Sequence, residues 1–559
     1  MDVTVVKDGI RVADVYAPRS FWDMIFQPKV ICCILTVVNL LNYCDRGIVP
    51  GSTNEFDQFI QKNVNTNTPD VYLGLLQSAF IVGFSLASIV CGHAVHYYPP
   101  FYLCGIGLSV WCVAVLFSGL AFQFNSYAFL LIARMISGCG EASFQCSVPP
   151  WIQSTMPAGT TGMWLSLFYT SIPVGTAVGY VYSAIVSEKV GVKWAFIFEC
   201  FMMAPFVLYL FAVSPRYPSL NAPKKQEGGL AGEDAEALMA YDRDDIDSVN
   251  NKSRKGSEDG HIVASNELLA ADASKHTRPS IWQELVAIYS RPVYICIVLG
   301  YAAQTGSLIG VSTFGSAFLM GIGFYETETQ ASTLFGVLIS IAGIVGTLAG
   351  GFLLDKRMAK DQARHQTERN SMELSVDGLA KRKRHEAREI KNKQITTACT
   401  IMVIANFFGA LLMWSVYLIY NKALYMIAIG LGCALMFSTT PAISIAAMNS
   451  VKSGNRAFAM AMMSVMLHAL GDVPSPVLAG LLKDDLAPDC VGVPAASEQC
   501  RQDNHGLRLT MLIIGLWLTW VVIFFGLARY ISTKPQLRCD TNDEDEEEDS
   551  SPLGAPLIH

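Results

Sequence analysis

The sequence predicts an all-α membrane protein of about twelve transmembrane helices, arranged as two six-helix bundles. Three observations favour this class. The chain has 559 residues, of which 52% are hydrophobic and only 16% are charged, whereas soluble domains carry about a quarter charged residues. The charge is segregated into polar stretches that separate long apolar blocks. The long polar stretch 214–291 lies between two sets of about six such blocks.

Each apolar block holds about 20 mostly apolar residues, which is the length a helix needs to cross a bilayer. In the first half the blocks are Lys29–Val49, Tyr72–Val95, Phe101–Phe122, Ser126–Val148, Gly162–Val186 and Trp194–Val213. In the second half they are Pro292–Phe314, Ala331–Leu354, Ile395–Tyr420, Ala423–Met448, Arg456–Leu482 and Leu507–Ile531.

The polar stretches set the expected domain boundaries. Stretch 214–291 is rich in Gly, Asp, Ser and Lys and has little to bury, so we expect a mostly disordered linker. The expected parts are a cytosolic N-terminal segment 1–28, a first bundle 29–213, the linker 214–291, a second bundle 292–531 with a basic insertion 355–394, and an acidic tail 532–559.

Lysine and arginine determine the expected orientation, because they concentrate in cytosolic joins. The linker and the insertion contain many lysines and arginines, including the basic run 381–384 in the insertion. On the other side of the membrane, the join 315–330 contains no lysine or arginine. Both termini should therefore be cytosolic. The net charge of −7 resides in the polar segments and gives no reason to expect nucleic-acid binding, and we expect a monomer in the membrane.

Asp45 and Arg46 end the first apolar block, where ionisable side chains are costly. Such groups persist where they pair, face a bundle interior or line a water-filled path, so this pair is a candidate functional site. The alternative is an interfacial pair that only fixes the helix end.

Arg134 and Glu141 lie seven residues apart in the fourth block, which is two helical turns, so they should project from one face. Gly138 and Gly140 between them should allow close approach of a neighbouring helix. The alternative is a static clamp between this helix and the first.

His468 and Asp472 lie four residues apart in the eleventh block and should also share a face. An imidazole beside an acid can carry a proton near neutral pH. Pro474 and Pro476 follow and should break the helix there. The alternative is a histidine that only satisfies a structural hydrogen bond.

Weaker polar candidates lie in the same blocks. As cavity-lining residues we predict Asn42, Tyr43, Thr170, Glu199, Gln304 and Ser312. Taken singly, each also fits ordinary helix packing by small and polar side chains.

Cys490 and Cys500 share a hydrophilic join on the side opposite the termini, where a disulfide is expected to persist. Two free thiols are the alternative. The sequence contains no CxxC pair and no His/Cys metal spacing, so we expect neither a metal nor another cofactor.

Three common sequence motifs of ATP-binding proteins and hydrolytic enzymes are absent from the sequence. There is no GxxxxGK[ST] loop for ATP and no HExxH or GxSxG motif. The sequence therefore favours a secondary transporter over a pump, and a non-enzyme over an enzyme.

Several segments together resemble the Spinster family of the major facilitator superfamily. Asn42–Gly51 resembles its NYxDRxxxPG signature, Gly140–Phe144 its GEA[ST][FY] segment, and Gly471–Pro476 its GDxxSP core, while Gly350–Lys356 is similar to the superfamily's loop signature. One segment departs from the pattern: Gly92–Pro100 lacks the Asp-Arg that usually follows helix 2, which puts the usual charge latch there in doubt.

The resemblance implies two six-helix halves that rock about a central site, the mechanism called alternating access. It implies that the solute is a lipid with a polar or zwitterionic head and one chain, such as a lysophospholipid or a sphingolipid. It also implies that protons are the coupling ion, with Asp45 and Glu141 as the protonation pair and Arg46 and Arg134 as their partners. His468 and Asp472 would form a second cluster.

We expect the membrane of a lysosome or another acidic organelle, with the plasma membrane as the other option. Two rival functions stay open from the sequence. One is a carrier of a small organic anion or sugar with the same fold, and the other is a lipid receptor or scaffold that resembles a transporter.

Overall fold

The computed structural model describes residues 6–7, 10–11, 24–64, 69–157, 159–217, 280–369, 379–490 and 497–534. Most of the predicted linker 214–291, most of the acidic tail 532–559 and about two thirds of segment 1–28 lie outside the described residues. The predicted all-α fold class is confirmed. Beside the helices there is one pair of two-residue antiparallel strands, β1 (Val6–Lys7) and β2 (Ile10–Arg11).

The first half contains six long helices. They are α3 (Pro28–Gly51), α5 (Pro69–Ala94), α6 (Pro100–Phe124), α7 (Tyr127–Thr155), α8 (Thr161–Val190) and α9 (Val192–Val213). The short helices α4 (Thr53–Val64) and η1 (Ser214–Arg216) follow α3 and α9.

The second half begins with the short helix α13 (Ile281–Tyr289). A capping box formed by Ser280 and Gln283 stabilises its N-terminus. Three of its long helices are uninterrupted: α14 (Pro292–Gly321), α15 (Glu328–Arg369) and α16 (Leu379–Ser415). Three more are each built from consecutive segments. They are α17 (Lys422–Phe437) with α18 (Thr440–Asn449); α19 (Arg456–Leu467) with η6 (His468–Asp472) and α20 (Pro474–Leu486); and α22 (Asn504–Leu516) with α23 (Leu518–Ser532). The short helices η4 (Val416–Leu418), η5 (Ser453–Asn455), η7 (Pro488–Cys490) and α21 (Glu498–Gln502) lie in the joins.

Ten helical segments among the described residues are long and apolar enough to cross a membrane. Helices α7 and α8, of 29 and 30 residues, are not among these ten, but each packs against helices that are: α7 on α5 and α6, and α8 on α3. Together these segments correspond to the predicted spans.

Glycines allow the tight packing of the first half. A Cβ at Gly47 of α3 would lie 2.7 Å from the Thr176 carbonyl oxygen of α8. A Cβ at Gly138 would collide with the Phe80 carbonyl of α5, and one at Gly140 would lie 2.5 Å from the Trp111 amide of α6. The predicted close approach at Gly138 and Gly140 is thereby confirmed.

The helix that carries His468 is interrupted where the prolines predict a break. Pro474 is the first residue of α20, and the preceding turn, η6, is a π-helix. A proline has no N–H to donate to the preceding turn, so the regular ladder cannot continue through it.

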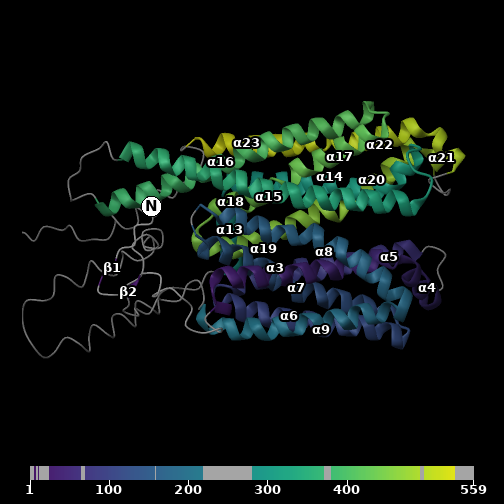
Figure 1. Cartoon of the computed structure of the whole chain (residues 1–559), viewed down its shortest axis with the longest axis horizontal. Coiled ribbons are helices and arrows are strands. Elements are labelled where there is room, and N and C mark those ends of the chain that lie inside the picture. The colour runs from purple at the N-terminus through teal and green to yellow at the C-terminus, as the bar shows by residue number, and fades with distance from the viewer. Residues whose placement is uncertain are drawn as a thin grey trace, which may run out of the picture.

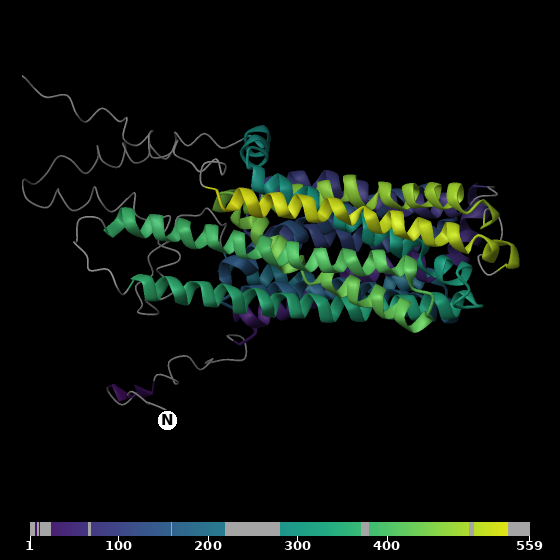
Figure 2. The ribbon, with the colours of Figure 1, turned by 90° about the horizontal axis from the view of Figure 1, so that it is seen from above.

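The two halves form two layers (Figure 1). We call the end of the bundle that contains the start of α3 and the end of α23 the terminus-side end, and the opposite end the far end. Helices α15 and α16 extend beyond the other helices at the terminus-side end, and α13 lies there across the bundle axis (Figure 2).

The halves touch each other toward the terminus-side end. Helix α19 packs on α5 and α7 of the first half, whereas its continuation α20, at the far end, packs on α14 and α22 of its own half. The Asp355 carboxylate accepts hydrogen bonds of 2.8 Å from the backbone N–H groups of Gly162 and Met163. Gln153 donates to Asn449 across 2.8 Å. The terminus-side end is therefore closed.

Candidate functional site

Asp45 is fully buried and points from α3 toward α7. Its two carboxylate oxygens accept from Arg134 Nη1 at 2.6 and 2.8 Å. The Arg134 side chain is only 3% exposed, so this ion pair is removed from water. Both members of the pair were predicted site residues.

Arg46 points to a different part of α7, because adjacent helical residues differ by about 100° in direction. Its Nη2 lies 2.8 Å from Glu141 Oε1, and Glu141 is fully buried while Arg46 is 21% exposed. Arg134 and Glu141 thus share a face of α7, as predicted, but each binds its opposite charge on α3. The result is two ion pairs in parallel between the same two helices.

A chain of amides extends from Glu141 into the first half. Gln145 donates to Asn39 Oδ1 at 2.7 Å and to Glu141 Oε1 at 3.4 Å. Asn39 in turn donates to Ser171 Oγ at 2.7 Å on α8. The network therefore connects α3, α7 and α8.

Aromatic rings surround the two guanidinium groups. The Arg46 guanidinium lies 4.7 Å from the centre of the Tyr43 ring and 4.8 Å from that of Phe80, and the Arg134 guanidinium lies 5.2 Å from the same Phe80 ring. Rings at this distance attract a cation and exclude water, which strengthens the neighbouring ion pairs.

Glu199 on α9 is a third acid in this region. It is fully buried, and its carboxylate makes a side-chain hydrogen bond with the Cys44 thiol. It also interacts electrostatically with Asp45 and Arg134. Glu199 is therefore a third, buried member of the Asp45–Arg134 cluster.

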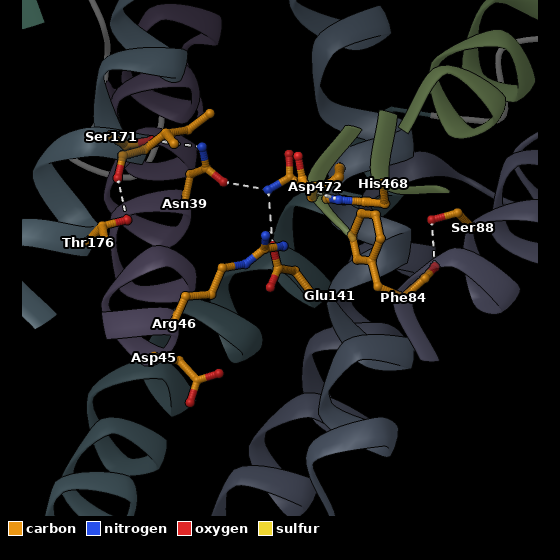
Figure 3. A network of polar contacts seen from close by, with 12 residues as sticks. Asn39, Asp45, Arg46, Phe84, Ser88, Glu141, Ser171, Thr176, His468 and Asp472 are labelled. Carbon is orange, nitrogen blue, oxygen red and sulfur yellow. Dashed lines mark hydrogen bonds and ion pairs between the residues drawn. The ribbon is translucent and has the colours of Figure 1, made fainter. Parts of the chain in front are cut away.

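His468 and Asp472 approach the same centre from the second half. His468 Nδ1 lies 2.6 Å from Asp472 Oδ2, and the His468 ring meets the Phe84 ring of α5 edge to face at 5.3 Å. Asp472 interacts electrostatically with Arg46. Figure 3 shows Arg46 and Glu141 between Asn39 on one side and the His468–Asp472 pair on the other.

The remaining predicted residues behave differently from one another. Asn42 is buried, and its amide has no partner among the described residues. Thr170 is half-buried and donates to the Ser166 carbonyl of its own helix. Ser312 is an exposed residue of α14.

Gln304 is held by hydrogen bonds to a neighbouring helix, and its place in the cavity lining stays a prediction. It is 2% exposed, donates to the Met436 carbonyl at 3.0 Å and accepts from Thr439. The physical reason is the interruption between α17 and α18, whose carbonyl and hydroxyl groups lack regular helical partners and bind this amide instead.

Sequence reasoning missed several members of the site: Asn39, Phe80, Phe84, Gln145 and Tyr169. Spacing could have found two of them, since Asn39 lies two turns before Arg46 and Gln145 one turn after Glu141. Tyr169 accepts from Ser444 at 2.8 Å across the two halves, and nothing in the local sequence indicates this contact.

Cys490 and Cys500 are joined as a disulfide at the far end. Among the described residues, no group of three or more His, Cys, Asp or Glu side chains could hold a metal ion.

A proton on Glu141 would cancel its charge and weaken its ion pair with Arg46. The two ion pairs differ in exposure, because the Arg46 side chain is 21% exposed whereas that of Arg134 is 3% exposed.

Residues 35–476 match the Major Facilitator Superfamily. The probable sphingolipid transporter spinster homolog 1 of Arabidopsis thaliana is 28% identical over 95% of this chain and 95% of its own. Human protein spinster homolog 1 is 24% identical over 82% of this chain and 74% of its own.

Among solved structures, a bacterial homolog to the human lysosomal transporter Spinster, in an inward-facing and unoccupied conformation, aligns with a TM-score of 0.53. Its sequence is 14% identical, and the alignment covers 90% of this chain and 97% of that chain. These relatives are transporters rather than enzymes.

Proposed function

Because this chain belongs to the Major Facilitator Superfamily and its relatives are spinster proteins, we propose that it is a proton-coupled secondary transporter of single-chain lipids with a polar head. Lysophospholipids and sphingolipid-type molecules are the proposed solutes. The Arabidopsis relative is named a probable sphingolipid transporter, which supports the lipid class.

The observation that carries the proposal is the unequal exposure of the two parallel ion pairs. Asp45–Arg134 is buried with Glu199 and holds α3 to α7. Arg46–Glu141 is within reach of solute and interacts with Asp472 of the other half. We assign proton coupling to Glu141 and Asp45, with Glu141 as the member that exchanges protons during the cycle.

In the proposed cycle, a lipid head binds between Arg46 and the His468–Asp472 pair when the far end is open. Protonation of Glu141 frees Arg46 for an anionic head group, and the halves then rock so that the closed terminus-side end opens. The lipid chain would lie against the apolar helix faces. We propose cytosolic termini and the membrane of an acidic organelle, where a proton gradient is available.

The test is uptake of labelled lysophospholipid by purified protein in liposomes, with and without an inward-acid gradient. We expect uptake to rise with the gradient and to vanish in Glu141→Gln. The matched control is Glu188→Gln, the same change at an exposed position of α8, which should transport like the parent protein.

Two results would redirect the proposal. Proton-linked flux of a hydrophilic organic anion or sugar, without lipid flux, would keep the transporter and change its solute. Lipid binding without flux of any solute would indicate a receptor or scaffold.

A further inference from the structure

Asp355 of the second half forms one of the contacts that close the terminus-side end, and the matching position of the first half can be compared with it. Gly351 lies where α15 crosses α8, since a Cβ there would lie 2.5 Å from the Gly162 carbonyl oxygen. Asp355 follows four residues later and caps the N-terminus of α8 through two backbone N–H groups. The second half thus contributes an acid that holds the first half.

The corresponding crossing in the first half has a histidine in place of this acid. Gly92 lies where α5 crosses α19, and a Cβ there would lie 2.7 Å from Ala461 Cβ. The residue four positions later, equivalent to Asp355, is His96. This is the departure from the Asp-Arg pattern noted in the sequence.

An acid from another helix meets this histidine. Glu284 of α13 places Oε2 2.9 Å from His93 Nδ1 and Oε1 2.8 Å from His96 Nε2. The Glu284 side chain is only 1% exposed, although Trp282 of the same short helix is 73% exposed. The helix therefore turns its one charged residue inward, onto the end of α5.

These contacts join the two halves, because α13 is connected to α14 of the second half by only two residues, Ser290 and Arg291. The contact between Glu284 and the two histidines must break, or α13 must follow the first half, when the terminus-side end opens. The contact of Glu284 with His93 and His96 lies at the end of α5, where the Asp-Arg charge latch of the superfamily is missing.

We propose that His93, His96 and Glu284 form a proton-sensitive latch that holds the terminus-side end closed. This latch is distinct from the central Asp45 and Glu141 cluster, and it does not depend on which solute is carried. The His93 contact with Glu284 is a hydrogen bond, and His96 Nε2 lies within ion-pair distance of the same carboxylate. A proton on either imidazole turns its contact into an ion pair, so acidification strengthens the latch and alkalinisation weakens it.

Other ionisable groups near the latch do not titrate in the same range. The Tyr97 ring lies 5.2 Å from His93, Tyr289 ends α13, Arg291 follows it, and Arg456 begins α19. Phenol and guanidinium groups keep their charge state between about pH 5 and 8, whereas imidazole changes its charge there. The Asp355 carboxylate also bridges the halves at this end, so the double histidine variant is needed to assign a response in that range to His93 and His96.

The test measures the distance between the halves at the terminus-side end by electron–electron double resonance. Spin labels are placed through Met24→Cys and Ser453→Cys, both at exposed positions. The background carries Cys33→Ser and Cys539→Ser, and labelling of this background without the two new cysteines is measured as the control. The protein is measured in nanodiscs at about pH 5.5 and about pH 8. Distances, not transport, are recorded, so failure of the latch and failure of the lipid proposal are distinguishable.

We expect the population of the open, longer distance to rise with pH in the parent protein. Glu284→Gln should raise the open-to-closed ratio on the order of tenfold at the lower pH, because it removes a charge-assisted bond. His93→Gln with His96→Gln should abolish the pH response. Glu326→Gln, at an exposed far-end position, is the matched control.

Two further variants separate the latch from other sites. Glu141→Gln should keep the pH response of the distance, and Asp355→Asn should open the terminus-side end at both pH values, since no histidine takes part in its bridge. An unchanged distance distribution in the parent protein between the two pH values would overturn the proposal. So would an undiminished response in the double histidine variant.

Discussion

Asp45→Asn should destabilise the protein more than Glu141→Gln, although each change removes one carboxylate charge from an ion pair between α3 and α7. The difference lies in the arginine left behind. Arg134 is 3% exposed and loses two contacts of 2.6 and 2.8 Å to Asp45. A buried charge without its partner costs about 3–5 kcal/mol.

Arg46 is 21% exposed and retains the rings of Tyr43 and Phe80 when Glu141 becomes neutral. Water and the aromatic faces still stabilise its charge, so the cost should be about 1–2 kcal/mol. The expected gap between the two single variants is therefore about 2–3 kcal/mol.

The assay is equilibrium unfolding in mixed micelles, followed by tryptophan fluorescence. The control is the double variant Asp45→Asn with Arg134→Gln, which removes both charges and should recover most of the loss. The reasoning would be refuted if the two single variants were equally stable, or if the double variant were less stable than Asp45→Asn alone.

Glu199 modifies this prediction in a testable way. Its carboxylate interacts electrostatically with Arg134 and is hydrogen-bonded only to the neutral Cys44 thiol, so it can take over part of the lost pairing in Asp45→Asn. Adding Glu199→Gln to Asp45→Asn should therefore lower stability further. In the parent protein the same change should cost less, because Asp45 still neutralises Arg134.

Three further predictions concern packing, the disulfide and the contact between the halves. Gly179→Ala should reduce the yield of folded protein, because its Cβ would collide with the backbone of α3, whereas Gly336→Ala, with nothing within 4 Å, should not; size-exclusion profiles in detergent measure both. Cys490→Ser should leave Cys500 as one additional thiol that can be alkylated in denatured, unreduced protein. It should also lower the free energy of unfolding by about 3 kcal/mol, because the disulfide no longer closes the loop. An unchanged thiol count by mass spectrometry would contradict the disulfide. Tyr169→Phe removes a 2.8 Å hydrogen bond between the halves and should shift the spin-label distances toward the open state by roughly fivefold; no shift would show that this bond does not favour the closed state.

The spans and the break at Pro474 could be predicted from the sequence because hydropathy and proline act locally. Transmembrane helices must satisfy their backbone hydrogen bonds internally, so composition alone marks them. The same holds for the glycines, which allow close approach on two faces of α7: Gly138 meets α5, and Gly140 meets α6.

Pairings between helices could not be predicted in the same way. Arg134 and Glu141 share a face of α7, but only the packing of α3 determines that each meets a different neighbour there. The side-chain amide of Gln304 looks like a cavity residue in sequence, yet it binds a helix interruption 132 residues away. Glu284 lies in a short helix at the end of the predicted linker 214–291, and its contact with His93 and His96 has no signal in the sequence.

The length of α15 and α16 has a consequence for observing the protein at work. These helices contain 42 and 37 residues, which correspond to about 63 and 56 Å at 1.5 Å per residue. A bilayer with its head groups is about 40–45 Å thick, so α15 alone extends about 20 Å past it. A rotation of the second half is therefore magnified at the tips of this helical pair. The chain has a mass of only 61.0 kDa, which is small for single-particle imaging. The two protruding helices would help to align its images, and their tilt would report the conformation.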